Sequence, residues 1–481
     1  MKKNLIYYVV IIGVFTTLAW MIINKGKSLV PISTHDISLE ITKEKSTPIQ
    51  IDSAESIKIQ FLHNIQHPLS LLLLQIIVIL VVSRLFGVVF TKIGQPSVVG
   101  EIIAGLFLGP SLMGAIFPEF FELLFPVDSL KTLQFLSQIG LTFFMFIVGM
   151  ELDLEGIKKK AQEALIISHA SIIFPFFLGI VLSYFVYEIF ATAGTSFLAF
   201  SLFMGTAMSI TAFPVLARIL QERGMTKSPL GNMVLTCAAA DDVTAWCILA
   251  AVIAIVKAGS IVSALFTIVL AVLFIGVMLY LVRPWIRKLS FRTLMVSETL
   301  DKSVVAIAFF ILLLSAYFAE IIGIHALFGA FLAGVIMPQN LMLKESLTDK
   351  LEDISVLILL PIFFAFTGLR TQVGLLNEGH LWATCGAVIL VAVVGKLGGS
   401  ALTARFVGQS WKDSLTIGAL MNTRGLMELI VLNIGYDLGI LSPEIFAIMV
   451  LMALSTTFMT GPLLDLIEYV NKKRLLRKSL N

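Results

Sequence analysis

The sequence predicts an all-α, polytopic membrane protein, because its composition suits lipid rather than water. Of its 481 residues, 58% are apolar and 14% are charged, and the mean hydropathy is +0.97. Soluble domains carry about 25% charged residues, and one soluble core stops growing near ~250–300 residues. These observations exclude a soluble globular enzyme, a disordered chain and a coiled coil. The 34 Gly and 15 Pro fit membrane helices, which contain both more often than soluble ones.

Runs of about 20 apolar residues, the length that crosses a ~30 Å hydrocarbon layer, mark the expected helices. A hydrophobic segment at about 5–23 comes first, followed by a polar stretch. Thirteen further spans are expected near residues 68–90, 97–117, 130–150, 162–187, 195–219, 229–256, 260–282, 302–321, 324–338, 354–369, 382–404, 414–436 and 444–469.

The loop charges alternate along these spans. Every second loop is basic, as with Lys92 after the first span and residues 158–160 (KKK) after the third, whereas the loops between them are acidic or nearly neutral. Because positive loops stay in the cytoplasm, we expect a multi-pass protein of the cell (inner) membrane with a basic cytoplasmic tail at 471–481. The net charge of +3 is too small to indicate nucleic-acid binding.

The chain divides into four expected parts. Residues 1–23 fit either an uncleaved signal anchor or a cleaved signal peptide, and both interpretations stay open. Residues 24–66 are expected to form an extracytoplasmic polar linker. Residues 67–470 form the transmembrane domain, and the tail at 471–481 is too short to fold by itself.

An internal repeat is predicted from two pairs of similar segments. Residues 101–110 (EIIAGLFLGP) resemble 329–338 (GAFLAGVIMP), and 143–150 (FFMFIVGM) resemble 363–369 (FFAFTGL). The offset is seven spans, an odd number, so equivalent helices cross in opposite directions. Inverted repeats of this kind belong to secondary transporters with a site near the midplane of the membrane.

The repeat makes the fifth and twelfth spans equivalent, and both contain residues that weaken a helix. Pro214 removes a backbone donor from the fifth span, and Gly425 loosens the twelfth. Broken helices at membrane depth are tolerated where they line a cavity, and their freed backbone groups bind ions. Ser209, Asn422 and Thr423, which lie in these polar stretches, are therefore candidate supporting groups.

Asp241 and Asp242 lie near the middle of the sixth span. One charge at the bilayer centre costs at least ~2.5–3.5 kcal/mol, and such residues mark ion or proton pathways. Adjacent helical positions differ by about 100°, so one carboxylate can face an ion cavity while the other faces a partner. Lys396, deep in the eleventh span, is the expected partner. Since Arg424 and Glu428 lie four positions apart, we expect them to pair with each other.

Three segments resemble the second branch of the monovalent cation:proton antiporters, which includes bacterial Na⁺/H⁺ and K⁺/H⁺ antiporters and plant cation/H⁺ exchangers. They are residues 95–105 (QPSVVGEIIAG), 239–246 (AADDVTAW) and 421–429 (MNTRGLMEL). The resemblance covers about residues 68–470. It implies a helical core with two crossed broken helices that moves against a dimerising scaffold, and hence a homodimer in the lipid bilayer.

The resemblance also implies roles for individual residues. Asp242 corresponds to the carboxylate that binds the alkali cation or the proton, and Asp241 to the residue that pairs with the buried lysine, Lys396. Thr211 corresponds to an oxygen that coordinates the cation. The match at Arg424 is looser. The implied function is secondary transport, with Na⁺ and/or K⁺ exchanged for protons at one competitive site and no cofactor.

Two carboxylates and a lysine predict two protons for each cation, which makes the exchange electrogenic. An electroneutral K⁺/H⁺ exchanger is the alternative, and a cation channel or sensor of the same fold is a further one. An enzyme is not expected, because the sequence contains no His-Glu-x-x-His or Gly-x-Ser-x-Gly motif.

Overall fold

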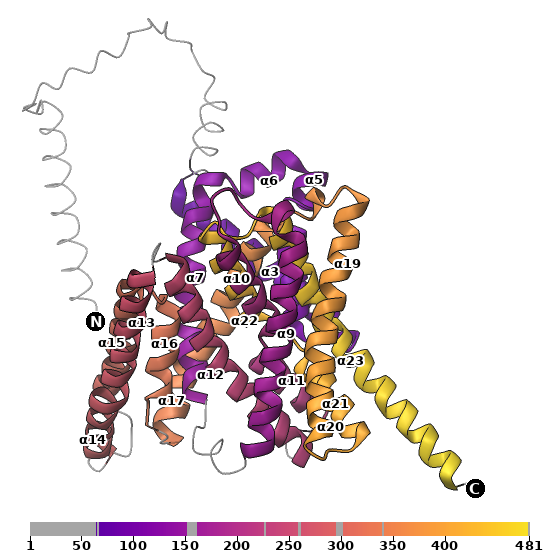
Figure 1. Ribbon diagram of the computed structural model, residues 1–481. Coiled ribbons are helices and arrows are strands. Elements are labelled where there is room, and N and C mark those ends of the chain that lie inside the picture. The colour runs from indigo at the N-terminus through magenta and orange to yellow at the C-terminus, as the bar shows by residue number, and fades with distance from the viewer. Residues whose placement is uncertain are drawn as a thin grey trace, which may run out of the picture. The chain divides into compact units, whose positions relative to one another are not determined.

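The computed structural model describes residue 64 and residues 67–151, 161–225, 228–257, 261–294, 302–338 and 341–479 (Figure 1). The predicted N-terminal segment 1–23 and, apart from residue 64, the predicted linker 24–66 lie outside the described residues. The described elements are helical, and one isolated β-bridge joins Ala191 to Leu441.

Eleven helices in the described part of the chain are long and apolar enough to cross a membrane. The count is twelve if Trp411–Met421 and Leu426–Asp437, which meet at a 42° bend, form one span. The protein is therefore an all-helical, polytopic membrane protein. Each of the thirteen predicted spans overlaps a described helix, but the ninth is only α16 (Ala326–Val335), of 10 residues. At 1.5 Å per residue it covers about 15 Å, half the hydrocarbon thickness.

One group of helices packs mainly within itself, and we call it the scaffold bundle. Helix α3 packs on α4, α15 on α16, and both α4 and α7 on α18, while α7 also packs on α16. Its members are α3 (Pro68–Lys92), α4 (Ser97–Leu108), α7 (Val127–Glu151), α15 (Lys302–Ile322), α16 and α18 (Leu360–Arg370).

Glycines allow two of these helix pairs to approach closely. A Cβ atom at Gly105 of α4 would overlap the carbonyl oxygen of Phe364 on α18, and one at Gly334 of α16 would overlap that of Phe146 on α7. Small residues that let backbones meet are typical of membrane helix interfaces.

The second group, which we call the crossing bundle, holds both broken helices. Helix α9 packs on α10, α12 and α20, while α21 and α22 both pack on α23. Its members are α9 (Ala161–Phe190), α10 (Phe197–Ser209), α11 (Phe213–Glu222), α12 (Pro229–Lys257), α19 (Gly379–Val393), η4 (Val394–Gly398), α20 (Gly399–Phe406), α21 (Trp411–Met421), α22 (Leu426–Asp437) and α23 (Pro443–Ser479).

The remaining elements connect these groups or cover their ends. Helix α13 packs on both α12 and α15 and so bridges the two bundles. The connecting elements are α5 (Met113–Ile116), α6 (Pro118–Leu124), α13 (Ile261–Val277), η1 (Met278–Val282), α14 (Arg283–Leu294), α17 (Leu341–Ile354), η2 (Ser355–Leu359) and η3 (Val373–Leu375).

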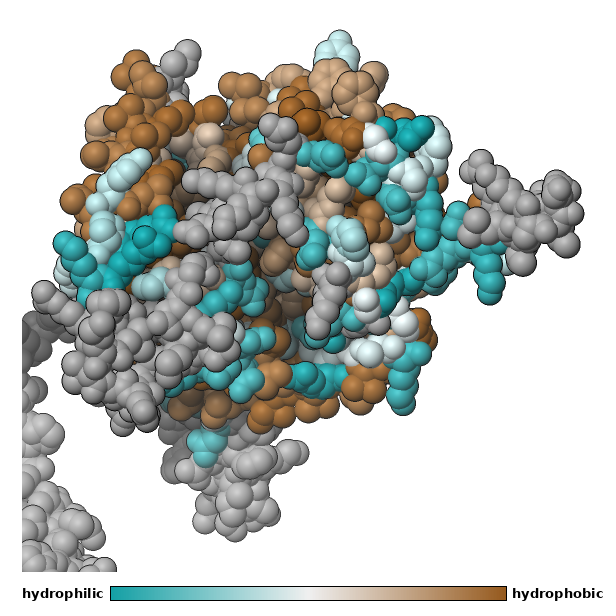
Figure 2. Space-filling view, turned by 90° about the horizontal axis from the view of Figure 1, so that it is seen from below, coloured by the Kyte–Doolittle hydropathy of each residue, from teal (hydrophilic) through white to brown (hydrophobic). Residues whose placement is uncertain are grey.

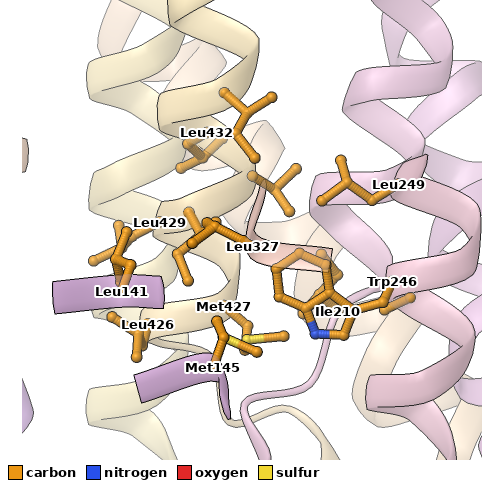
Figure 3. Packing of buried hydrophobic residues seen from close by; sticks show 14 of the residues in the cluster. Leu141, Met145, Ile210, Trp246, Leu249, Leu327, Leu426, Met427, Leu429 and Leu432 are labelled. Carbon is orange, nitrogen blue, oxygen red and sulfur yellow. The ribbon is translucent and has the colours of Figure 1, made fainter. Parts of the chain in front are cut away.

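The bundles meet through buried apolar side chains. Figure 3 shows Leu141 and Met145 of α7 beside Leu426 and Met427 of α22, in the same cluster as Trp246 of α12. Polar residues instead gather at the ends of the molecule. Figure 2 shows the end at which α14, α17 and α20 lie, where hydrophilic side chains spread across the face between hydrophobic margins.

Candidate functional site

The two helix breaks predicted from the sequence contact each other inside the crossing bundle. The chain is non-helical at residues 210–212 between α10 and α11, and α21 ends before residues 422–425. The backbone N–H of Ala212 donates to the carbonyl oxygen of Thr423 at 3.1 Å. Pro214 lies in the first turn of α11, where a missing N–H costs no intrahelical bond. The proline therefore permits the second half-helix to begin there.

Asp241, on α12, is fully buried and held by four donors. Its Oδ1 accepts from Ser168 at 2.6 Å, and its Oδ2 accepts from Ser171 at 3.1 Å and Thr211 at 2.7 Å. The fourth donor is the ammonium of Lys396, with Nζ 3.0 Å from Oδ2. Donors of this kind stabilise a buried carboxylate in its charged form. The structure thus brings Thr211 and Lys396 together at Asp241, and Thr211 does not bond Asp242 in this conformation.

Lys396 lies in η4, a π-helical turn within the span that runs from α19 to α20, and its side chain is fully buried. Its ammonium also donates to the carbonyl oxygens of Ser171, at 2.9 Å, and Ser209. Ser209 is the last residue of α10, where unpaired carbonyls and the helix dipole favour a cation. The backbone of Ser209 contacts the site, whereas its hydroxyl donates to the carbonyl of Thr206 at 2.8 Å.

Asp242, the next residue of α12, has different surroundings. It is also fully buried, yet neither of its carboxylate oxygens has a hydrogen-bond partner in the described part of the chain. An isolated ionised carboxylate in such a place is very costly. Asp242 thus differs from Asp241 in having no group among the described residues that would stabilise its charge.

The predicted pair of Arg424 and Glu428 is formed, with Nη1 2.9 Å from Oε1 and both side chains buried. Arg424 also donates to the carbonyl oxygens of Ala207, at 2.8 Å, and Met208, at 2.6 Å. Together with Lys396 at Ser209, it places two protein cations on the C-terminal end of α10. The freed carbonyls that the sequence suggested as ion ligands are thus occupied by the protein's own side chains on this half-helix.

The other two supporting candidates lie in the second break. Both polar side-chain atoms of Asn422 are buried without a hydrogen-bond partner among the described residues. Thr423 Oγ1 lies 3.2 Å from Oγ1 of Thr460 on α23. Thr457 of α23 accepts from the backbone N–H of Arg424 at 3.1 Å and donates to its carbonyl at 2.7 Å, so α23 satisfies the unwound backbone.

Sequence reasoning missed Ser168, Ser171 and Thr457. The two serines lie three residues apart in an otherwise apolar helix, which places them on one face. That spacing was the available signal. Thr457 has no comparable signal, because its role depends on how α23 packs against a helix break.

A cavity of about 570 Å³ lies between the two bundles. It is lined by Phe213 and Pro214, which directly follow the first break, and by two carboxylates, Glu151 of α7 and Glu352 of α17. Arg218 also lines it, so the lining carries charges of both signs. The cavity therefore lies between α17 and the start of α11, which directly follows the first break.

The chain is similar to known proteins of one family. Residues 62–467 match the family model described as "Sodium/hydrogen exchanger, transmembrane". The chain is 46% identical over 396 residues to Na(+)/H(+) antiporter NhaS4 of Synechocystis, covering 82% of this chain and 96% of that protein.

Longer relatives also match. The chain is 41% identical to Cation/H(+) antiporter 17 of Arabidopsis thaliana, over 83% of this chain and 48% of the relative. It is 35% identical to K(+)/H(+) antiporter 1 of Saccharomyces cerevisiae, over 88% and 49%. The chain therefore spans about half the length of these plant and yeast relatives.

The fold resembles that of the sodium proton antiporter MjNhaP1 from Methanocaldococcus jannaschii. The TM-score is 0.61 at 14% identity, with 86% of this chain and 97% of the other covered.

Proposed function

Because the chain belongs to the sodium/hydrogen exchanger family, in the second branch of the monovalent cation:proton antiporters, we propose that it exchanges Na⁺ or K⁺ for protons at Asp242. Membership makes it a cation/proton antiporter and a transporter rather than an enzyme. The carrying observation is the unequal environment of two adjacent carboxylates, since Asp241 is fully bonded whereas Asp242 has no donor among the described residues.

The charges of the buried site support competition. Three carboxylates, Asp241, Asp242 and Glu428, face two cations, Lys396 and Arg424, and all five side chains are fully buried. With every group ionised, one negative charge remains, and either one proton or one alkali cation would neutralise it. With one proton exchanged per cation the loaded site would be neutral and would move more readily than the empty site, because a net buried charge resists transfer through a low-dielectric barrier. Oxygen ligands suit hard alkali cations.

For the stoichiometry we propose two protons per cation, with the second proton carried by Lys396. In this proposal a cation that draws on Asp241 weakens the 3.0 Å contact with Lys396, and the ammonium then releases its proton. The cation-loaded site then keeps one negative charge, so its movement would depend on the membrane potential. The electroneutral alternative also rests on an observation: three hydroxyl donors hold Asp241 in place, and a single charge is in excess.

Equivalent contacts in the scaffold bundle support the inverted repeat. Gly105 of α4 meets Gly368 of α18, and Gly334 of α16 meets Gly149 of α7. Exchanging α4 with α16 and α7 with α18 converts one helix pair into the other, although the contacting glycines are one position out of register in the similar segments. Alternating access by movement of one bundle against the other follows from such repeats.

We extend the proposal to the chain's surroundings. It places the protein in the cell (inner) membrane as a homodimer, with the tail at 471–481 cytoplasmic. The basic residues support this orientation, because helix α14, which carries Arg283 and Arg287, lies at the same end as α17 (Figure 1), and α17 lines the 570 Å³ cavity. The large cavity would then face the cytoplasm.

Cation-induced pH change in everted membrane vesicles tests the proposed function, with Na⁺, K⁺ and Li⁺ added in turn. Asp242→Asn should abolish the signal for every cation, while Asp128→Asn, at an exposed position in the first turn of α7, should leave it unchanged. Full exchange by Asp242→Asn would show that the site lies elsewhere. Downhill cation flux without proton movement would instead favour a channel.

A further inference from the structure

An ion pair joins the two bundles at the end opposite the large cavity. Arg370, the last residue of α18, lies with Nη1 2.6 Å from Oδ1 of Asp437, the last residue of α22. The side chains are 17% and 33% exposed. The guanidinium also lies over the ring of Phe366, 4.3 Å from its centroid. One partner therefore belongs to the scaffold bundle and the other to the crossing bundle.

Neighbouring polar contacts cross the same boundary. Gln134 of α7 donates to both carboxylate oxygens of Asp437, at 3.5 and 3.4 Å. Asn433 of α22 donates to Thr367 Oγ1 of α18 at 2.9 Å, and its Oδ1 accepts from Arg370 at 3.4 Å. The C-terminal end of α22, from Asn433 to Asp437, is thus fastened to two scaffold helices by hydrogen bonds.

Little space remains under this cluster. The cavity lined by Gln134, Ser137, His325 and Asp437 measures about 20 Å³, room for about one water molecule. Deeper in the interface, Leu141 and Met145 of α7 lie beside Leu426 and Met427 of α22 (Figure 3). The interface between the bundles is therefore filled at the Arg370 end and hollow, with about 570 Å³, at the other.

We propose that the Arg370–Asp437 pair is a lock that holds the bundles together at this end and so sets how readily the site opens there. The proposal rests on the proposed function, in which the bundles move against each other. The salt bridge must break before α22 separates from α18, so its free energy counts directly against the conformation open at this end. Both residues act as positioning residues, since neither contacts Asp241 or Asp242 in the described structure.

Thiol labelling at Ser137 tests the lock without any transport assay. Ser137 is 2% exposed and lines the small cavity, so Ser137→Cys reports opening at the Arg370 end. Purified, detergent-solubilised protein is treated with a charged maleimide, and protein with native Ser137 is treated in parallel to subtract labelling of Cys237, Cys247 and Cys385. Asp437→Asn, and separately Arg370→Gln, are combined with the reporter.

The matched control is another ion pair of similar geometry. Arg223 and Asp465 are 2.8 Å apart, but they join α11 to α23 within the crossing bundle. Asp437→Asn and Arg370→Gln should each raise the labelling rate about two- to fivefold, the loss expected for a part-exposed pair, while Asp465→Asn should leave it unchanged.

Three results would overturn the lock. They are fast labelling with the pair intact, no increase in both lock variants, and an equal increase in Asp465→Asn. Labelling needs no transported cation, so the two proposals are tested separately. A labelling result that contradicts the lock would not contradict exchange at Asp242, and a transport result that contradicts exchange at Asp242 would not change the meaning of the labelling rates. A thermal melt of each variant confirms that the labelled protein is folded.

Discussion

Asp241 and Asp242 are consecutive residues of α12, yet the first accepts four hydrogen bonds and the second accepts none within the described chain. The helix turn between neighbours, about 100°, sends one carboxylate toward α9 and Lys396. The two adjacent carboxylates therefore have different surroundings, and the proposed exchange assigns the proton or cation to the second.

The Asp241–Lys396 pair should show strong coupling in stability. Asp241→Asn or Lys396→Met alone leaves a buried charge without its partner and should cost about 3–5 kcal/mol. The double variant removes both charges and should cost clearly less than the sum. Thermal and denaturant unfolding of the purified proteins measure this cycle, and simple additivity would contradict the pairing.

Arg424 should be far more sensitive than a surface arginine. Arg424→Lys keeps the charge but cannot bind Glu428 and the carbonyls of Ala207 and Met208 with one planar group, so we expect a loss of about 2–4 kcal/mol. Arg223→Lys, at the part-exposed pair with Asp465, should cost at most about 1 kcal/mol. Equal melting temperatures for the two variants would show that Arg424 does not hold the end of α10.

Two glycine-to-alanine substitutions should differ in their effect on stability, because Gly334 lies where α16 closely approaches α7, whereas Gly386 of α19 has open space beside it. Gly334→Ala places a methyl group against the backbone of Phe146 and should destabilise the protein by about 1–3 kcal/mol. Gly386→Ala, on α19 with nothing within 4 Å of the new carbon, should be neutral or gain up to about 1 kcal/mol. Melting temperatures of both variants check the packing, and a tolerated Gly334→Ala would contradict it.

Exchange in proteoliposomes under imposed membrane potentials tests the stoichiometry. Two protons per cation predict a rate that changes with the sign of the potential, because each cycle moves one net charge. If Lys396 carries the second proton, any exchange that remains in Lys396→Met should be indifferent to the potential. Indifference in the unsubstituted protein would instead establish the electroneutral alternative.

The parts of the site predicted from the sequence are those whose residues are anomalous in an apolar helix. Asp241, Asp242 and Lys396 are charged residues within apolar spans, where a charge is costly. Pro214 and Gly425 weaken the two helices that the repeat makes equivalent. The three-residue spacing of Ser168 and Ser171 indicated a shared helix face, but hydroxyls are common in membrane helices, and only packing gives these serines and Thr457 their partners. The position of Thr211 on Asp241 likewise depends on the conformation of the break.

The fold, like the site, was predictable only in part. Hydropathy located every described long helix, because a span needs a continuous apolar run of a set length. The helix in the ninth span is shorter than predicted: apolar residues continue beyond Val335, but α16 ends there after 10 residues. Composition alone does not indicate the residue at which such a helix ends.

The most direct test of the central claim is proton release when a cation binds purified protein in weakly buffered solution. Addition of Na⁺ or K⁺ at a pH where Asp242 holds its proton should release protons in proportion to the cation bound. Asp242→Asn should bind no cation and release none, while Asp128→Asn should behave as the unsubstituted protein. Cation binding without proton release, or release that persists in Asp242→Asn, would contradict competition at this carboxylate.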